Sequence, residues 1–124
     1  MTFPRAITDP PISEAGYQDT VAELLQLHKF LVFHARPAMT KKGYRTPVSY
    51  DGAGFPDLVA IGNGHVMFIE VKRNSMGLSP NQERWADVAS EVSCLTDRVS
   101  YWTLRPKDWE RFVGYVKGIR RRNG

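Results

Sequence analysis

The sequence of 124 residues has very little cysteine and no long apolar run. Its single cysteine, Cys94, excludes an internal disulfide and a zinc site built from several cysteines. Because Cys94 follows an apolar helical stripe, we expect it to be a core residue. No apolar run approaches the length that spans a bilayer, so we expect no membrane partner. The N-terminal residues lack an apolar signal core, which predicts that the chain stays in the cytoplasm.

Acidic residues are also fewer than basic ones, and the formal net charge is +4. The length fits one domain. Two basic clusters would suit a polyanion with closely spaced phosphates, although solvated charge is an alternative interpretation of the C-terminal cluster. The first cluster comprises Arg36, Lys41, Lys42 and Arg45, and the second comprises Lys117, Arg120, Arg121 and Arg122.

The most informative stretch consists of two apolar runs, 58–61 and 66–69, joined by the segment 62–64. This segment is Gly-Asn-Gly, and these residues tolerate the positive φ that tight hairpin turns need, so the stretch predicts a β-hairpin. Asp57 precedes the first run and Glu70 follows the second. In an antiparallel pair these two positions are near neighbours across the ladder. The hairpin therefore places two carboxylates at one end.

Two adjacent carboxylates repel, and one takes up a proton unless a cation or hydrogen-bond donors stabilise both charges. Oxygen ligands in this arrangement suit Mg²⁺ or Mn²⁺, and the backbone carbonyl of Val71 could be a further ligand. Lys72 lies two residues after Glu70 and leaves the strand on the same face. A structural ion pair between Lys72 and Asp57 or Glu70 is the alternative interpretation of this cluster.

A helix is predicted over residues 13–29, with Ser13 as its N-cap. Glu14 and Gln18 continue its apolar face, whereas Glu23 lies on the opposite side. A carboxylate and an amide on an apolar face need partners or border a site. The proximity of Glu14 to the helix N-terminus offers a second explanation for that residue. The apolar face consists of Tyr17, Val21, Leu24, Leu25 and His28.

Residues 30–34 predict a short buried strand that ends at His34, which is either a satisfied polar residue or a site residue. Residues 35–54 contain several prolines and glycines and predict a long loop. Loops of this length in small domains are usually functional or disordered. The loop combines its basic residues with Tyr44 and Tyr50, which could contact phosphates and stack on exposed bases.

A second helix is predicted to begin after Ser79, with Pro80 at its first position and Gln82 completing a capping box. The helix has an apolar stripe that would place Gln82 on the buried face, so a site role for Gln82 can coexist with capping. A strand over 99–104 and a short helix over about 107–117 follow. The stripe consists of Trp85, Val88, Ala89 and Val92.

Three segments resemble a known family when taken together: 54–58 (Gly-Phe-Pro-Asp-Leu), 70–72 (Glu-Val-Lys) and 78–82 (Leu-Ser-Pro-Asn-Gln). The pair Pro-Asp and Glu-x-Lys resembles the PD-(D/E)xK nuclease signature. The longer set resembles the virus-type replication-repair nuclease (VRR-NUC) domain, over about residues 13–109. The resemblance implies an α/β fold with a restriction-endonuclease-like core: helix, three strands, helix, strand, with a mixed central sheet flanked by helices.

The resemblance also implies a catalytic set, Asp57, Glu70, Lys72, Gln82, Glu14 and Gln18. In such a site Asp57 and Glu70 would hold Mg²⁺ or Mn²⁺, and Glu14 would contact the metal through water or help to hold a second ion. Lys72 would orient the attacking water or stabilise charge on the phosphate. Gln82 and Gln18 would position the lysine, the water or the first-helix carboxylate. The DNA-binding residues would be Arg36, Lys41, Lys42, Arg45 and Arg73.

The resemblance implies a metal-dependent DNA endonuclease without an organic cofactor, acting on branched DNA such as four-way (Holliday) junctions, and a homodimer would place two sites on opposing strands. If the chain is encoded by a phage, its compartment would be the host cytoplasm. The alternatives are a monomeric nickase or flap or single-strand nuclease, and a non-catalytic DNA-binding module. We expect an extended arm over 1–12, one nuclease domain over 13–117 and a basic tail over 118–124.

Overall fold

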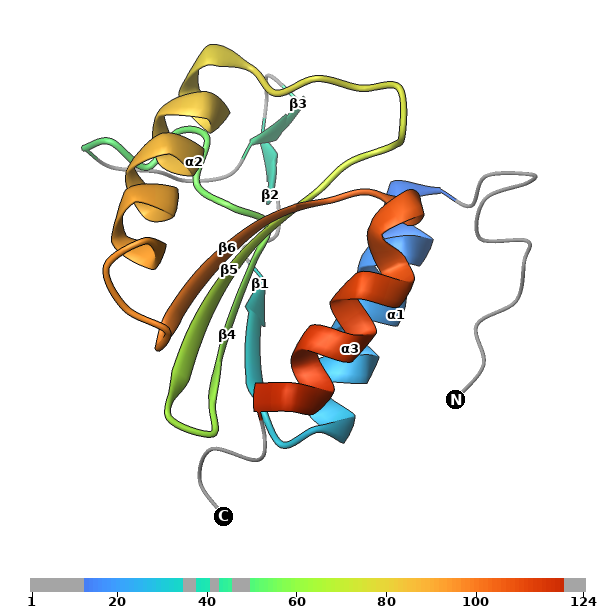
Figure 1. Ribbon diagram of the computed structural model, residues 1–124. Coiled ribbons are helices and arrows are strands. Elements are labelled where there is room, and N and C mark those ends of the chain that lie inside the picture. Colours follow the sequence, from blue (N-terminus) through green and yellow to red (C-terminus); the bar gives the residue numbers. More distant parts are fainter. Residues whose placement is uncertain (1–12, 35–37, 41–42, 46–49, 120–124) are drawn as a thin grey trace.

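The computed structural model describes residues 13–34, 38–40, 43–45 and 50–119. It has an α/β fold in which a four-stranded mixed sheet separates α1 and α3 on one face from α2 on the other (Figure 1). The elements are α1 (Glu14–Leu27), β1 (Leu31–His34), β2 (Ala38–Thr40), β3 (Gly43–Arg45), β4 (Leu58–Gly62), β5 (His65–Val71), α2 (Pro80–Ser93), β6 (Val99–Leu104), a 3-10 turn η2 (Pro106–Asp108) and α3 (Trp109–Ile119).

The sheet has the order β1-β4-β5-β6, with antiparallel pairs except for β5 and β6, which run parallel. The core lies between the sheet and the pair α1 and α3. Among the described residues, no helix is long and apolar enough to cross a membrane. The core contains Tyr17, Val21, Leu24 and Leu25 from α1, alternate residues of β4 and β5, and Trp109, Phe112, Val116 and Ile119 from α3.

The predicted hairpin is confirmed in its turn and its register. Asn63 and Gly64 have φ values of 54° and 72°, and Gly62 pairs with His65 around them. A two-residue turn with positive φ at both central positions matches the twist of the flanking strands. Leu58 pairs with Ile69 at the other end of the hairpin. The residues just beyond this pair are Asp57 and Glu70, which therefore meet across the ladder.

Both predicted helix starts are also confirmed. The side chain of Ser13 accepts a hydrogen bond from the backbone N–H of Gly16, and Ser79 and Gln82 form a reciprocal capping box. These caps satisfy backbone donors that the first helical turn leaves unpaired. The capping box fixes where the first turn of α2 begins and therefore where Gln82 lies.

The strand predicted over residues 30–34 is confirmed as β1, but its predicted burial is wrong. Leu31 is 80% exposed and Phe33 is 60% exposed, whereas Val32 packs against the core. The reason is that β1 is an edge strand covered on one face only, since α2 lies over the opposite end of the sheet, beside β6. Phe30, just before the strand, is buried.

The expected position of Cys94 in the core is also wrong, because this residue caps the C-terminus of α2 and is exposed. The predicted buried face of α2 is shifted. Val88 is 62% exposed and Val92 is 40% exposed, whereas Ala86 and Ala89 are buried. Small alanine side chains let α2 approach the sheet closely, and the larger valines flank that contact.

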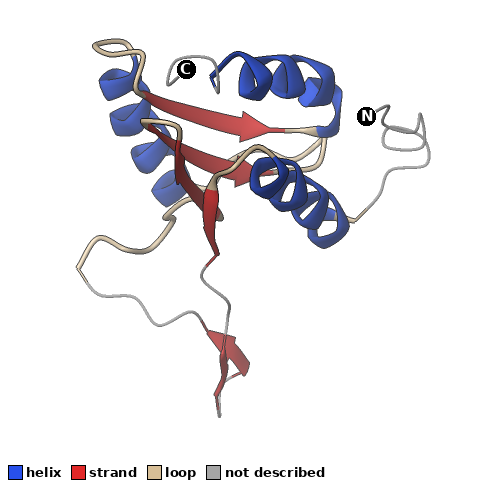
Figure 2. Ribbon diagram, turned by 90° about the horizontal axis from the view of Figure 1, so that it is seen from below, coloured by secondary structure: helices blue, strands red, loops and turns tan. Residues whose placement is uncertain are grey.

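The predicted loop over 35–54 contains two short strands. β2 and β3 pair antiparallel with each other and lie apart from the four-stranded sheet (Figure 2). At the C-terminus α3 continues to the buried residue Ile119, slightly beyond the predicted end of the helix at about residue 117. The predicted arm over 1–12 and residues 120–124 of the predicted tail lie outside the described residues.

Gly54 fixes the loop before β4 against the start of α2. Its φ is +82°, and a Cβ atom at this position would lie 2.5 Å from the backbone carbon of Asn81. Both the positive φ and the close approach require glycine. Because Asn81 precedes Gln82, this contact sets the distance between the loop that leads to Asp57 and the first turn of α2.

We predict that Gly54→Ala lowers the free energy of unfolding by about 2–4 kcal/mol, through backbone strain and the clash with Asn81. Urea unfolding measures the change. Gly114→Ala is the matched control, because a Cβ atom at Gly114 in α3 would meet nothing within 4 Å. That control should be neutral or stabilising, since alanine favours helices. A Gly54→Ala variant as stable as wild type would contradict the packing of this loop.

Candidate functional site

Asp57 and Glu70 form the centre of the candidate site. The Oδ2 atom of Asp57 accepts a hydrogen bond of 2.9 Å from the backbone N–H of Val71. Glu70 lies near the end of β5 and is 3% exposed. The carboxyl group of Asp57 lies close enough to Glu70 for its charge to act on it. The predicted meeting of the two carboxyl groups is therefore confirmed.

The environment of Glu70 favours its protonated form. Burial raises the pKa of Glu70 to about 8, and the charge of Asp57 acts in the same direction. The charge of Lys72 lowers this pKa, and the charge of Glu14 raises it. In the protein without a bound cation, one proton between Asp57 and Glu70 therefore relieves the repulsion at neutral pH.

Gln82 has both predicted roles. Its Oε1 atom accepts a hydrogen bond of 2.8 Å from the backbone N–H of Ser79 and completes the capping box. Its Nε2 atom donates a hydrogen bond of 3.0 Å to Oε2 of Glu70. The capping box thus holds the side-chain amide of Gln82 in place through its oxygen atom, and the nitrogen atom of the same amide contacts Glu70.

Lys72 lies near the carboxyl groups but is not ion-paired with them. Its charge acts on Glu70. Within the part of the chain that the structure describes, the ion pairs closer than 4.0 Å are Arg84 with Asp51 and Arg111 with Asp108. The alternative interpretation of Lys72 as the partner of a structural ion pair is therefore not supported.

The first helix contributes Glu14 and Gln18 in different ways. Glu14 is half-buried and close enough for its charge to act on Glu70, whereas Glu23 is exposed, as its helical phase predicted. Gln18 contacts His34, a residue that the sequence had not linked to it. Its Nε2 atom lies 3.2 Å from Nε2 of His34, and the other ring nitrogen of His34 lies 2.9 Å from the carbonyl oxygen of Asp57.

Sequence reasoning missed Tyr101 and Thr103 on β6. The two hydroxyl groups lie 3.0 Å apart, and Thr103 is the register partner of Glu70. Burial raises the pKa of Tyr101, and the charges of Glu70 and Asp57 add to the effect. The alternation of the strand would have placed both residues on one face. The parallel pairing of β5 with β6, which brings that face to Glu70, has no local sequence signal.

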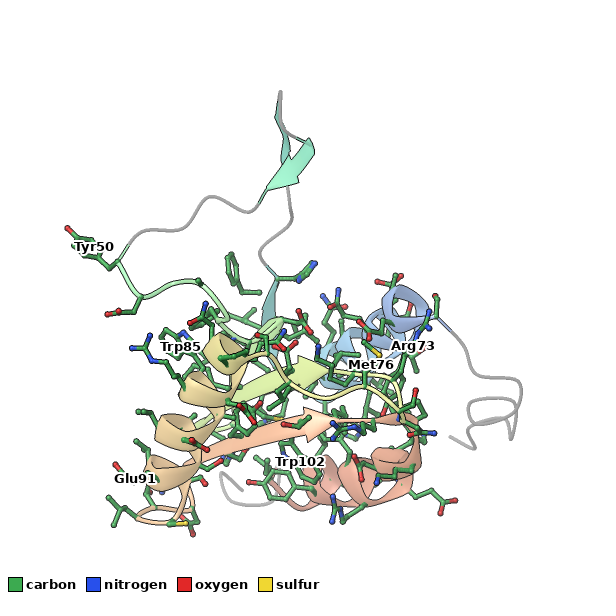
Figure 3. The ribbon with its side chains drawn as sticks, turned by 90° about the horizontal axis from the view of Figure 1, so that it is seen from above. Tyr50, Arg73, Met76, Trp85, Glu91 and Trp102 are labelled. Carbon is green, nitrogen blue, oxygen red and sulfur yellow. The ribbon has the colours of Figure 1, made fainter. Side chains whose placement is uncertain are left out.

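The predicted DNA-binding residues are only partly described. Arg73 is exposed and extends from the loop after β5 (Figure 3). Arg36, Lys41 and Lys42 lie outside the described residues, and only the backbone of Arg45 in β3 is described. The backbone carbonyl of Val71 stays a predicted ligand.

The raised pKa of Glu70 predicts that the metal-free protein loses stability as pH rises. An unfolded glutamate releases its proton near pH 4.5, whereas folded Glu70 keeps it up to about pH 8. Between these two pH values the folded state binds more protons than the unfolded state. The contribution of Glu70 to the free energy of unfolding is therefore greatest below about pH 4.5 and decreases as the pH rises to about 8. Glu70→Gln has no proton to lose. It should flatten this slope and exceed wild type above pH 8 by on the order of 1–2 kcal/mol.

Urea unfolding with a chelator, repeated across this pH window, measures the slope. Glu91→Gln, on the exposed side of α2, is the control and should keep the wild-type slope. A wild-type slope in Glu70→Gln would contradict the shared proton.

Comparisons with known proteins give little further information. No family model matches the chain, and no curated protein matches it. Among solved structures, the crystal structure of the protein of unknown function AF1548 is similar, with 16% sequence identity and a TM-score of 0.34. The match covers 82% of this chain and 55% of that chain. The chain therefore spans about half the length of that structure, and the likeness carries no functional argument.

Proposed function

We propose that this protein is a metal-dependent DNA endonuclease of the VRR-NUC type. The observation that carries the proposal is the buried carboxyl group of Glu70 beside the half-buried Asp57, with a raised pKa that favours a proton where a cation could bind. Placing a second carboxyl group beside the buried Glu70 is costly for a purely structural role, because burial and like charge both oppose the ionisation of Glu70. Strongly perturbed carboxyl groups are typical of functional sites.

The donor set fits Mg²⁺ or Mn²⁺. In the described segments, no group of three or more histidine, cysteine, aspartate or glutamate side chains is arranged to hold a metal ion. Mg²⁺ usually keeps several waters and binds through one or two carboxylates together with substrate phosphates. Asp57 and Glu70 would supply those carboxylates, and a cation would take the place of the shared proton. Glu14 would contact the cation through water or help to hold a second one.

The remaining residues have roles that follow from their contacts. When bound, the metal ion would polarise the scissile phosphate and activate the attacking water. The amine of Lys72, near the carboxyl groups but outside ion-pair distance, would orient that water or stabilise negative charge on the phosphate. Gln82 would hold Glu70 in place through its hydrogen bond of 3.0 Å.

The order of elements supports a restriction-endonuclease-like core. Leaving aside β2 and β3, the chain runs α1, β1, β4, β5, α2, β6, which matches helix, three strands, helix, strand. The carboxyl pair lies at the end of the hairpin formed by β4 and β5. We propose branched DNA, such as a four-way junction, as the substrate and a homodimer as the active form, since two sites related by a two-fold axis could cut opposing strands.

We predict that Asp57→Asn abolishes cleavage of a four-way junction and leaves DNA binding intact. The substitution removes the charge that a cation needs, and less negative charge near the phosphate should not weaken DNA binding. The assay compares four-way junction, flap, duplex and single-stranded DNA with Mg²⁺ and with chelator. Asp87→Asn, exposed on α2, is the matched control.

Near-wild-type turnover by Asp57→Asn would contradict the metal site. Metal-dependent cleavage restricted to flaps or single strands would favour the monomeric alternative, and DNA binding without cleavage by wild type would favour the non-catalytic one.

The first helix allows a second test with a matched pair of glutamates. We predict that Glu14→Gln lowers turnover by at least about tenfold, because the carboxylate of Glu14 acts on the site. Removing a group that supports a metal site typically lowers activity 10- to 100-fold. Glu23→Gln on the same helix should retain wild-type turnover, because Glu23 is exposed. Single-turnover cleavage at saturating protein measures both. Equal activity of the two variants would remove Glu14 from the site.

A further inference from the structure

His34 joins the first helix to the main chain of Asp57. Its Nδ1 atom lies 2.9 Å from the carbonyl oxygen of Asp57, and its Nε2 atom lies 3.2 Å from Nε2 of Gln18. A carbonyl oxygen only accepts hydrogen bonds, so Nδ1 carries the hydrogen. In the neutral ring Nε2 is then the acceptor for the amide hydrogen of Gln18. The two contacts therefore fix one tautomer and one ring orientation.

The contact lies at the end of the β1–β4 ladder. His34 is the last residue of β1 and pairs with Leu58, the first residue of β4. Asp57 is one position beyond this pair, so the imidazole continues the ladder with a side-chain hydrogen bond. On the other side, the carboxylate of Asp57 accepts the N–H of Val71 from β5. Asp57 is thus tied to β1 through its main chain and to β5 through its side chain.

We propose that His34 is a positioning residue that holds Asp57 in place for cation binding, with Gln18 setting the orientation of the imidazole. This inference rests on the proposed function, but its main readout does not require a metal ion. Partners that hold metal ligands typically change metal affinity by 10- to 100-fold when they are removed. The same chain of contacts connects Asp57 to α1, the helix that carries Glu14.

The test uses two substitutions at His34 that separate its two contacts. His34→Ala removes both hydrogen bonds. His34→Asn places an amide N–H near the position of Nδ1, so it can still donate to the carbonyl oxygen of Asp57, but it does not reach Gln18. If His34 positions Asp57, then His34→Asn should restore most of the slow amide exchange and Mn²⁺ affinity that His34→Ala loses. A role in general packing would not give this rescue, because Asn is smaller than histidine and polar.

The matched control is Asn63→Gly at the other end of β4. The side chain of Asn63 donates a hydrogen bond of 2.9 Å to the carbonyl oxygen of His28, the same kind of contact at the same distance. Glycine keeps the positive φ that the turn needs and removes only the contact. The control therefore measures the loss of a side-chain to main-chain hydrogen bond away from the site.

The metal-free readout is hydrogen exchange of the Val71 amide, whose acceptor is Asp57. In His34→Ala this amide should exchange about tenfold faster or more, because its acceptor is less constrained. His34→Asn should restore slow exchange, and Asn63→Gly should leave the rate unchanged. Unchanged exchange in His34→Ala, or acceleration to the same extent in Asn63→Gly, would overturn the proposal whether or not the protein binds metal.

The second readout is calorimetric binding of Mn²⁺ to the full chain. His34→Ala should weaken binding about tenfold or more, and His34→Asn should bind within a few-fold of wild type. Wild-type affinity in His34→Ala would overturn the role of His34 and leave the metal site standing. Absence of binding to wild type would instead overturn the proposed function, and the exchange experiment alone would then decide whether His34 holds Asp57.

Discussion

A buried carboxyl group beside a second carboxyl group resists ionisation unless a cation or several donors lie nearby. Glu70 is buried beside the half-buried Asp57, and burial together with the charge of Asp57 raises the pKa of Glu70. The surrounding contacts restrain the pair rather than separate it: Val71 donates to Asp57, and Gln82 donates to Glu70. The energetic cost of keeping the acids together is difficult to explain by folding alone, and a function that uses their combined charge explains it directly.

The fold keeps this pair in place with local devices that each depend on a few residues. The turn at Asn63 and Gly64 sets the register that brings Asp57 opposite Glu70. The close approach of Gly54 to α2 and the capping box place the Gln82 amide against the acid. These contacts come from the hairpin itself and from the segments that precede and follow it in the chain.

The sequence was sufficient to predict these local devices, because turns, caps and strand alternation depend on neighbouring residues. It correctly separated Glu14 from Glu23 by helical phase. It failed where burial depends on which elements cover a strand: Phe33 and Val88 are apolar but exposed, since α2 covers only part of its sheet face. The contact of His34 with Asp57 and the place of Tyr101 near the site follow from strand order, which no short motif specifies.

The central claim is that the corner between Asp57 and Glu70 is a cation site. Crystals grown or soaked with Mn²⁺ and measured near its absorption edge would locate the ion from its anomalous scattering. We expect one peak within coordination distance, about 2.0–2.3 Å, of an oxygen atom from each carboxylate. A structure with Mn²⁺ elsewhere on the protein, and with no ion between Asp57 and Glu70, would contradict the account.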